Sequence, residues 1–309
     1  MYSANVGTGP KSSMQAASRN TFALFSPKLV QTSLNPWPEH SLRPDTSTHM
    51  NSAQITLLGD ELYNSFCERT VVEPLTGRYA ELTIEDAYHV QQRMVQRRLD
   101  AGEAVVGKKI GVTSKAVMDM LGVYQPDFGY LLSGMVYGEG QAIPLGTLIQ
   151  PKAEGEIAFI LKKDLFGPGI TNANVLAATE CVMPCFEIVD SRIRDWKIKI
   201  QDTVADNASC GVFVLGDCAV SPAAIDLSTC GMVLEKNGEV IGTGSGAAVL
   251  GSPVNAVAWL ANTLGRLGIP LKAGEVILSG AMAAMVVVNP KDNFRVSIGG
   301  LGSCSVRFN

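Results

Sequence analysis

Two glutamates one residue apart, Glu154 and Glu156, lie in the segment 153–160, which is otherwise apolar and typical of a β-strand. The two-residue period of a strand places both carboxylates on one face, about 7 Å apart along the chain. Because that face continues as Ala158 and Ile160, we expect the carboxylates to point into a partly buried cavity. Taken alone, two glutamates with this spacing fit a solvated strand edge equally well.

A third glutamate, Glu187, lies in the almost wholly apolar run 181–189. An ionised carboxylate buried in such a run must be paired with a cation or bound to a metal. Together with the two earlier glutamates it would offer three oxygen ligands, which suit Mg²⁺ or Mn²⁺. The sequence leaves an alternative open at even weight, because Arg192 and Arg194 follow closely and could neutralise Glu187 without a metal.

Two lysines and two further polar residues are weaker candidates. Lys108 and Lys109 lie between glycines in a strand-like segment, and alternation lets only one of them face the cavity; a solvated strand edge explains them as well. Asp127 lies in a Gln-Pro-Asp-Phe-Gly segment that we expect to form a turn, which most such aspartates merely shape. Ser279 ends another expected strand, where its hydroxyl could hold a carboxylate, but an ordinary turn gives the same pattern.

Composition excludes several other kinds of site. His40 and His49 precede the part expected to fold, so only His89 remains, and neither a Ser-His-Asp triad nor a His-rich metal site can form. There is no phosphate loop, and the glycines of residues 299–302 indicate a tight bend between strands. With 25 basic and 29 acidic residues, a net charge of −4 and no basic run, we expect no nucleic-acid partner.

Apolar stretches and cysteines bear on location. The apolar stretches are shorter than the roughly 20 residues that a membrane-spanning helix requires, so we expect no membrane partner. The seven cysteines lie mostly in apolar segments and lack the paired spacing of a zinc site. We therefore expect buried free thiols in a reducing compartment and a cytoplasmic protein.

The elements that must position these residues fall into three parts. Residues 1–50 are rich in Ser, Asn, Thr and Pro and predict a disordered N-terminal extension, with an organellar transit peptide as the alternative. Residues 51–104 show two amphipathic helical patterns and predict a helical N-terminal subdomain. Residues 105–309 predict a β-rich catalytic domain, interrupted by one helix that begins at Pro253. The predicted class is α+β, built around a curled or barrel-like sheet with strands at 105–112, 155–161, 182–189, 211–215, 231–235, 275–278 and 294–298.

Taken together, several segments resemble the 2-oxopent-4-enoate hydratases, also called 2-hydroxypenta-2,4-dienoate hydratases. These form the hydratase/decarboxylase branch of the fumarylacetoacetase-like superfamily. The resemblance covers about residues 50 to 309 and rests on residues 107–114, 125–129, 153–159, 189–196 and 202–211. It implies a distorted β-barrel-like mixed sheet with a helical N-terminal part.

The resemblance also implies roles for individual residues. It gives Mg²⁺ or Mn²⁺ as the cofactor and leaves open which acid/base residue donates and which accepts a proton. The implied residues are the metal ligands Glu154, Glu156 and Glu187, the acid/base residues Lys109 and Asp127, and the substrate contacts Ser209 and Ser279.

The implied function is the metal-dependent addition of water to 2-hydroxypenta-2,4-dienoate in the meta-cleavage catabolism of aromatic compounds. The resemblance implies a small 2-oxo or 2-hydroxydienoate acid as the ligand and a homo-oligomer as the assembly. It also allows a complex with a neighbouring pathway enzyme. A 4-oxalocrotonate decarboxylase of the same superfamily is the first alternative, disfavoured because Asp127 matches the hydratase pattern. A catalytically silent partner subunit is the second, kept open by residues 289–293, where the family has a more usual Gly-Asp turn.

Overall fold

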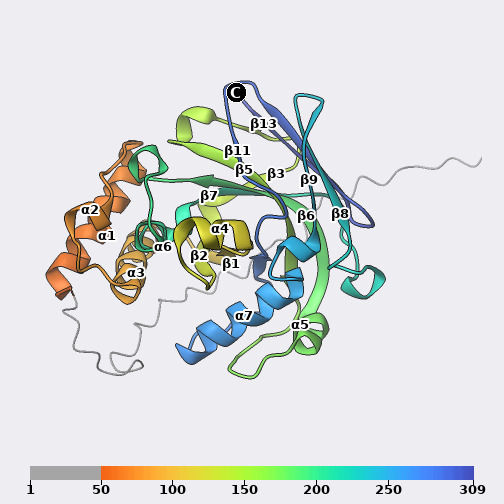
Figure 1. The fold of residues 1–309 in the computed structure, drawn as a ribbon, viewed down its shortest axis with the longest axis horizontal. Coiled ribbons are helices and arrows are strands. Elements are labelled where there is room, and N and C mark those ends of the chain that lie inside the picture. The colour runs from red at the N-terminus through yellow and green to blue at the C-terminus, as the bar shows by residue number, and fades with distance from the viewer. Residues whose placement is uncertain (1–49) are drawn as a thin grey trace, which may run out of the picture.

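The computed structural model describes residues 50–309, whose fold is shown in Figure 1. The predicted N-terminal extension, apart from Met50, lies outside the described residues. The N-terminal helices gather at one end of the molecule, and two β-sheets with the remaining helices form the larger part (Figure 1). The predicted α+β class with a mixed, curled sheet is confirmed. The domain boundaries near residues 50 and 104 stay predictions.

The described chain begins with three helices, α1 (Ser52–Glu68), the short α2 (Leu75–Arg78) and α3 (Ile84–Asp100). Both long helices start at a capping box: the side chain of Asn51 accepts a hydrogen bond from the Gln54 amide, and that of Thr83 from the Asp86 amide. The apolar faces of α1 and α3 meet in a hydrophobic cluster that also includes helix α6 (Ile200–Ala205). The two predicted helices are thus confirmed.

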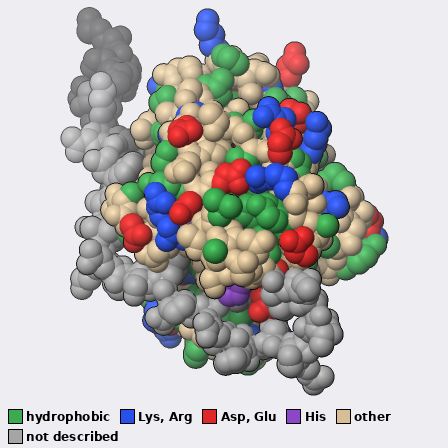
Figure 2. Space-filling view, turned by 90° about the vertical axis from the view of Figure 1, so that its left-hand side faces the viewer, with side chains coloured by type: hydrophobic (Ala, Val, Ile, Leu, Met, Phe, Trp, Pro, Cys, Tyr) green, Lys and Arg blue, Asp and Glu red, His purple; other side chains and the backbone are tan. Residues whose placement is uncertain are grey.

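The surface of this helical end carries charges of both signs. Figure 2 views the molecule from that side, and Lys and Arg side chains interleave there with Asp and Glu. Ion pairs join the helices, among them Arg93–Asp60 at 2.8 Å and Arg78–Glu61 at 2.9 Å. On this face the charges therefore pair locally and do not form a basic surface.

The larger sheet is mixed and has the strand order β2-β1-β10-β5-β6-β7-β3, with β11 paired to β5. Its strands are β1 (Val105–Gly111), β2 (Asp127–Leu132), β3 (Val136–Gly138), β5 (Pro151–Leu161), β6 (Thr179–Asp190), β7 (Cys210–Leu215), β10 (Val276–Leu278) and β11 (Val286–Val287). β1 runs parallel to β10 and β3 to β7, whereas the other pairs are antiparallel. The long pair β5–β6 forms the centre of the sheet because both strands are mostly apolar and buried.

A second sheet, of order β4-β13-β12-β8-β9, packs against the first. Its strands are β4 (Ala142–Ile143), β8 (Gly231–Lys236), β9 (Glu239–Ser245), β12 (Asn293–Ile298) and β13 (Gly302–Phe308). The rings of Phe294 in β12 and Phe186 in β6 lie 6.3 Å apart, and a Cβ added to Gly155 would lie 2.9 Å from Val296 Cγ2. Gly155 therefore faces the second sheet, and by strand alternation Glu154 and Glu156 face away from it.

The predicted helix at Pro253 is confirmed as α7 (Pro253–Arg266), which packs beside β1 and α5 (Asn172–Ala178). The segment Gly246–Arg266 is long and apolar enough, by length and mean hydropathy alone, to cross a membrane. By length and mean hydropathy, the expectation that the chain has no apolar segment of this length is therefore wrong. The polar residues within the segment lower its mean hydropathy too little to exclude it. Half of the segment's most apolar 18-residue stretch is buried inside the molecule, as in a core helix.

Two details of the sequence analysis require correction. Asp127 does not lie in a turn: it is the first residue of β2 and pairs with Gly111 of β1, whose missing side chain leaves room for the carboxylate. All seven cysteines are free, but Cys67 and Cys218 are exposed, because one lies near the end of α1 and the other follows β7 in a loop.

Candidate metal and active site

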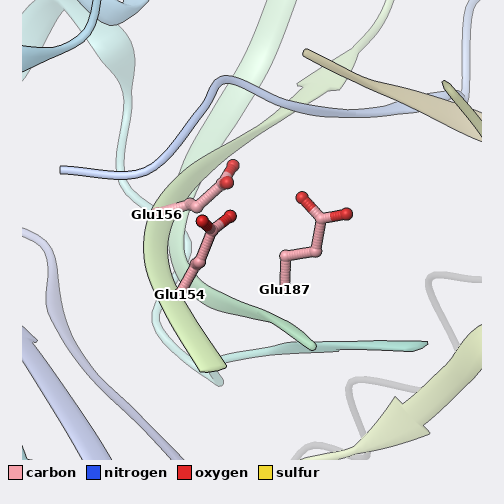
Figure 3. A group of neighbouring side chains, drawn as sticks. All are labelled: Glu154, Glu156 and Glu187. Carbon is pink, nitrogen blue, oxygen red and sulfur yellow. The ribbon is translucent and has the colours of Figure 1, made fainter. Parts of the chain in front are cut away.

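The three candidate glutamates lie together on the central pair of strands. Glu154 of β5 pairs directly with Glu187 of β6, so their side chains share one face of the sheet, and Glu156 follows on that face. One carboxylate oxygen from each glutamate lies within 4.8 Å of the other two. In Figure 3 the carboxylates of Glu154 and Glu156 lie close together, and Glu187 stands across a gap from them with its carboxylate directed the same way. Glu156 and Glu187 are fully buried and Glu154 is half-buried.

Neither of the arginines considered in the sequence analysis neutralises Glu187. Arg192 is buried and pairs with Asp206, whereas Arg194 reaches Glu73 at 2.5 Å. The alternative of an arginine ion pair is therefore wrong. The cation that approaches Glu187 is instead Lys109, whose Nζ lies 3.2 Å from Oε1.

The carboxylates retain unused hydrogen-bonding capacity. Among residues 50–309, Glu156 Oε1 and both oxygens of Glu187 are buried and accept no hydrogen bond, while Glu156 Oε2 accepts one from the Gly280 amide at 2.8 Å. Burial and the neighbouring charge of Glu187 raise the pKa of Glu154 to about 7 and hold that of Glu156 well above its usual range. Glu154 and Glu156 resist ionisation beside the buried Glu187, and oxygens of Glu156 and Glu187 have no hydrogen-bond partner in the described part of the chain. This combination fits a hard divalent cation.

The two strand lysines lie on opposite faces, as predicted. Lys108 binds Glu275 at 2.6 Å, away from the three glutamates. Lys109 is buried, and although burial would lower the pKa of its ammonium, the charges of Glu187 and Asp127 raise that pKa overall. Lys109 therefore stays a cation beside the cluster.

Asp127 lies next to Lys109 at the edge of this site. A Cβ added to Gly111 would overlap Asp127 Oδ1 and lie 3.4 Å from Lys109 Nζ, so both side chains crowd the same glycine. Asp127 Oδ1 is buried and has no hydrogen-bond partner in the described chain. Burial raises the pKa of the Asp127 carboxyl even though Lys109 opposes the shift. The role of Asp127 as an acid/base residue stays a prediction.

The two serines predicted to contact the substrate are both buried, and their hydroxyl groups contact other protein atoms. The Ser279 hydroxyl donates to the Ile157 carbonyl at 2.8 Å, which places Ser279 beside β5 next to Glu156. The Ser209 hydroxyl lies 3.2 Å from that of Thr203, in a turn whose residues have left-handed backbone angles. Their role as substrate contacts stays a prediction.

Two surface hollows lie elsewhere. One, of about 330 Å³, lies over the second sheet near Arg295 and Arg307. The other, of about 310 Å³, is lined by Lys152 and Trp196 near the start of β5. Neither is lined by the three glutamates, so the arrangement of the carboxylates, and not the size of a hollow, defines the candidate site.

The chain is similar to known proteins. Residues 109–309 match the family described as fumarylacetoacetate (FAA) hydrolase C-terminal. The chain belongs to this fumarylacetoacetate hydrolase family.

Within it, the chain is 70% identical over 221 residues to a 2-hydroxypent-2,4-dienoate hydratase of Pseudomonas putida, covering 71% of this chain and 100% of that protein. It is 59% identical over 252 residues to a 2-hydroxyhexa-2,4-dienoate hydratase of Comamonas testosteroni, covering 81% of this chain and 96% of that one. The predicted resemblance to the hydratases is confirmed.

A solved structure is also similar. The 4-oxalocrotonate decarboxylase from Pseudomonas putida G7, complexed with magnesium and adipate, matches with a TM-score of 0.82 and 39% identity over 84% of this chain and 99% of that one. Both the fold and the branch of the family therefore agree with the sequence analysis.

Proposed function

We propose that this chain is a divalent-metal-dependent hydro-lyase that adds water to 2-hydroxypenta-2,4-dienoate and gives 4-hydroxy-2-oxopentanoate, in the meta-cleavage catabolism of aromatic compounds. The observation that carries the proposal is the cluster of Glu154, Glu156 and Glu187, whose oxygens approach within 4.8 Å in a buried setting. The hydratase names of the relatives that are 70% and 59% identical support the reaction.

The three glutamates would hold Mg²⁺ or Mn²⁺, since both take carboxylate oxygens and leave positions for other oxygen ligands. The similar decarboxylase structures contain magnesium or calcium, which supports a divalent ion. When bound, such a cation supplies charge stabilisation for the substrate's C1 carboxylate and C2 oxygen.

Lys109 and Asp127 are the proposed acid/base pair. In the reaction the dienol loses its O2 proton and gains one at C5, which gives the 2-oxo-3-enoate. Water then adds its hydroxyl group at C4 and loses a proton, and a proton is gained at C3. Asp127 offers an unpartnered buried oxygen for a proton, and Lys109 stays positively charged beside it. Ser279, beside Glu156, and Ser209 are proposed as contacts for the substrate's carboxylate end.

A decarboxylase is the second candidate, supported by the 39% identical 4-oxalocrotonate decarboxylase structure. Decarboxylation needs no group that activates water, whereas the chain presents Asp127 with a free oxygen. The relatives of higher identity are hydratases, which favours hydration.

The alternative of a catalytically silent subunit rested on residues 289–293, and these residues form an ordered turn. The Asn289 amide donates to Asp292 at 2.7 Å, and Asp292 pairs with Lys236 of β8 at 2.8 Å. The turn is thus fixed by the second sheet. A cytoplasmic location, a homo-oligomer and a complex with a neighbouring pathway enzyme belong to the proposal as well.

The test is an absorbance assay of purified protein with 2-hydroxypenta-2,4-dienoate, with EDTA and then with Mg²⁺ restored, beside a parallel assay of CO₂ release from 4-oxalocrotonate. We expect metal-dependent loss of the dienoate, 4-hydroxy-2-oxopentanoate as product, and no CO₂. Unchanged dienoate absorbance under every condition would remove the hydratase assignment, and CO₂ release would favour the decarboxylase.

A further inference from the structure

Among the described residues, one main-chain group donates a hydrogen bond to Glu156. The amide of Gly280, two residues after β10, donates to Glu156 Oε2 at 2.8 Å. The other oxygen, Oε1, is buried and has no hydrogen-bond partner within the described part of the chain. The amide thus occupies one oxygen of the carboxylate and leaves the other for the shared space between the glutamates.

Two independent features make position 280 a glycine. Its φ of +112° is a backbone conformation that residues with a side chain rarely adopt. In addition, a Cβ at this position would overlap Thr113 Oγ1 and would lie 2.6 Å from Thr113 Cγ2. The Thr113 side chain therefore fills the space behind Gly280 and prevents this segment from moving away from Glu156.

A main-chain hydrogen bond and burial fix the position of Thr113. Its carbonyl accepts a hydrogen bond from the Leu250 amide at 3.1 Å, and its side chain is buried. The preceding residue, Val112, has a φ of +55°, which is a strained conformation for a β-branched residue. Such strain persists only where the surrounding structure fixes the backbone, so Thr113 is a rigid support for Gly280.

We propose that Gly280 and Thr113 are positioning residues for Glu156: Thr113 packs behind Gly280, and Gly280 directs its amide at one carboxylate oxygen so that the other binds the cation. The inference rests on the proposed function, because it assigns this role within the same metal site. It acts through packing and the main-chain amide, not through the Thr113 hydroxyl, which donates no hydrogen bond within residues 50–309.

The test measures Mn²⁺ binding by calorimetry to metal-free protein, together with amide hydrogen exchange at Gly280. Thr113→Ala empties the space behind Gly280. We therefore expect the Gly280 amide to exchange faster and Mn²⁺ affinity to fall about tenfold, which is the usual loss when a group that holds a metal ligand is changed. Thr113→Val preserves the shape, and we expect it to keep the wild-type affinity and exchange. Gly280→Ala should weaken binding at least as much as Thr113→Ala.

Gly274→Ala is the matched control, since Gly274 has a φ of +88° but nothing within 4 Å of an added Cβ. It imposes backbone strain on the same part of the chain without touching Glu156, and we expect unchanged Mn²⁺ affinity. If Thr113→Ala binds Mn²⁺ as tightly as the wild type does, the positioning role of Thr113 and Gly280 is refuted, while the proposed function stands. A wild-type chain that binds no Mn²⁺ would overturn the proposed function and the inference with it.

Discussion

At the scale of single residues, the metal-free site is electrostatically unfavourable. Three carboxyl groups lie side by side, two of them fully buried, and Lys109 is the cation that approaches them, at 3.2 Å from Glu187. Like charges in a buried setting repel more strongly than in water. Removing one charge should therefore help the metal-free protein and harm the metal-bound one.

Glu156→Gln separates these effects, because the amide oxygen of Gln can still accept the hydrogen bond from Gly280. We expect a melting temperature in EDTA at or above that of the wild type. We also expect loss of the stabilisation by Mg²⁺, which is about 2.7 kcal/mol at one hundred times Kd for a binding chain. Melting curves with EDTA and with Mg²⁺ measure both.

Glu180→Gln is the control for this experiment, since Glu180 lies on the same strand as Glu187 but its side chain is 64% exposed. It should keep the full Mg²⁺ stabilisation. A Glu156→Gln variant that is still stabilised by Mg²⁺ like the wild type would contradict the assignment of Glu156 as a ligand.

Asp127→Asn tests proton transfer apart from metal binding. Asp127 lies beside Lys109, outside the three-glutamate cluster, so we expect Mn²⁺ affinity to stay within a few-fold of wild type. The kcat for dienoate hydration should fall by about 10²–10⁴, the usual contribution of a positioned acid or base. Asp119→Asn, on the exposed face of α4 (Lys115–Leu121), should leave kcat unchanged. Undiminished kcat in Asp127→Asn would refute its acid/base role.

At the scale of elements, a buried arginine joins the two ends of a strained turn. Residues 207–209 have φ values of 51–53°, the left-handed conformation that costs roughly 1–2 kcal/mol for each residue other than glycine. Arg192 donates to the carbonyls of Asp206 at 2.5 Å and Cys210 at 2.9 Å, which flank this turn. Asn207 in turn binds both main-chain groups of Tyr130 in β2, the strand of Asp127.

Asp206→Asn should therefore be strongly destabilising, because it leaves the guanidinium of Arg192 buried without its counter-charge. We expect a loss of about 3–5 kcal/mol in the free energy of unfolding, measured by urea denaturation. Glu73→Gln breaks the exposed pair with Arg194 and should cost at most about 1 kcal/mol. Equal losses in the two variants would show that the buried pair does not hold the turn.

Local sequence patterns predicted part of this arrangement. Strand period placed Glu154 and Glu156 on one face, and an apolar run marked Glu187 as buried, both in agreement with the structure. The register that sets Glu154 opposite Glu187 depends on pairing between strands, which no local pattern encodes. The arginine alternative was wrong for the same reason: Arg192 finds its partner in Asp206, fourteen residues later.

Other elements gave too weak a signal. β9 and β13 were not predicted, because glycine and serine interrupt their apolar alternation. Thr113 was not predicted as part of the site, and neither was the hydrogen bond from the Gly280 amide to Glu156. A glycine after Ser279 was visible in the sequence, but its contact with Thr113 joins residues far apart in the chain.

At the scale of the whole molecule, the described fold begins with a helix that caps itself. The Asn51 side chain and Gln54 close the first turn of α1, so the helix start needs no residue before Met50. We expect a chain that starts at Met50 to keep the melting temperature and the kcat/KM of the full chain. A clear fall in either quantity would show that residues 1–49 contribute to the folded enzyme.

The proposed chemistry depends on one cation shared by three glutamates. Anomalous diffraction from crystals soaked in Mn²⁺ tests this most directly, since it locates the ion without reference to activity. We expect one strong peak about 2.0–2.3 Å from a carboxylate oxygen of each of Glu154, Glu156 and Glu187. A crystal with no peak among these three side chains, or with Mn²⁺ bound only elsewhere, would contradict the account.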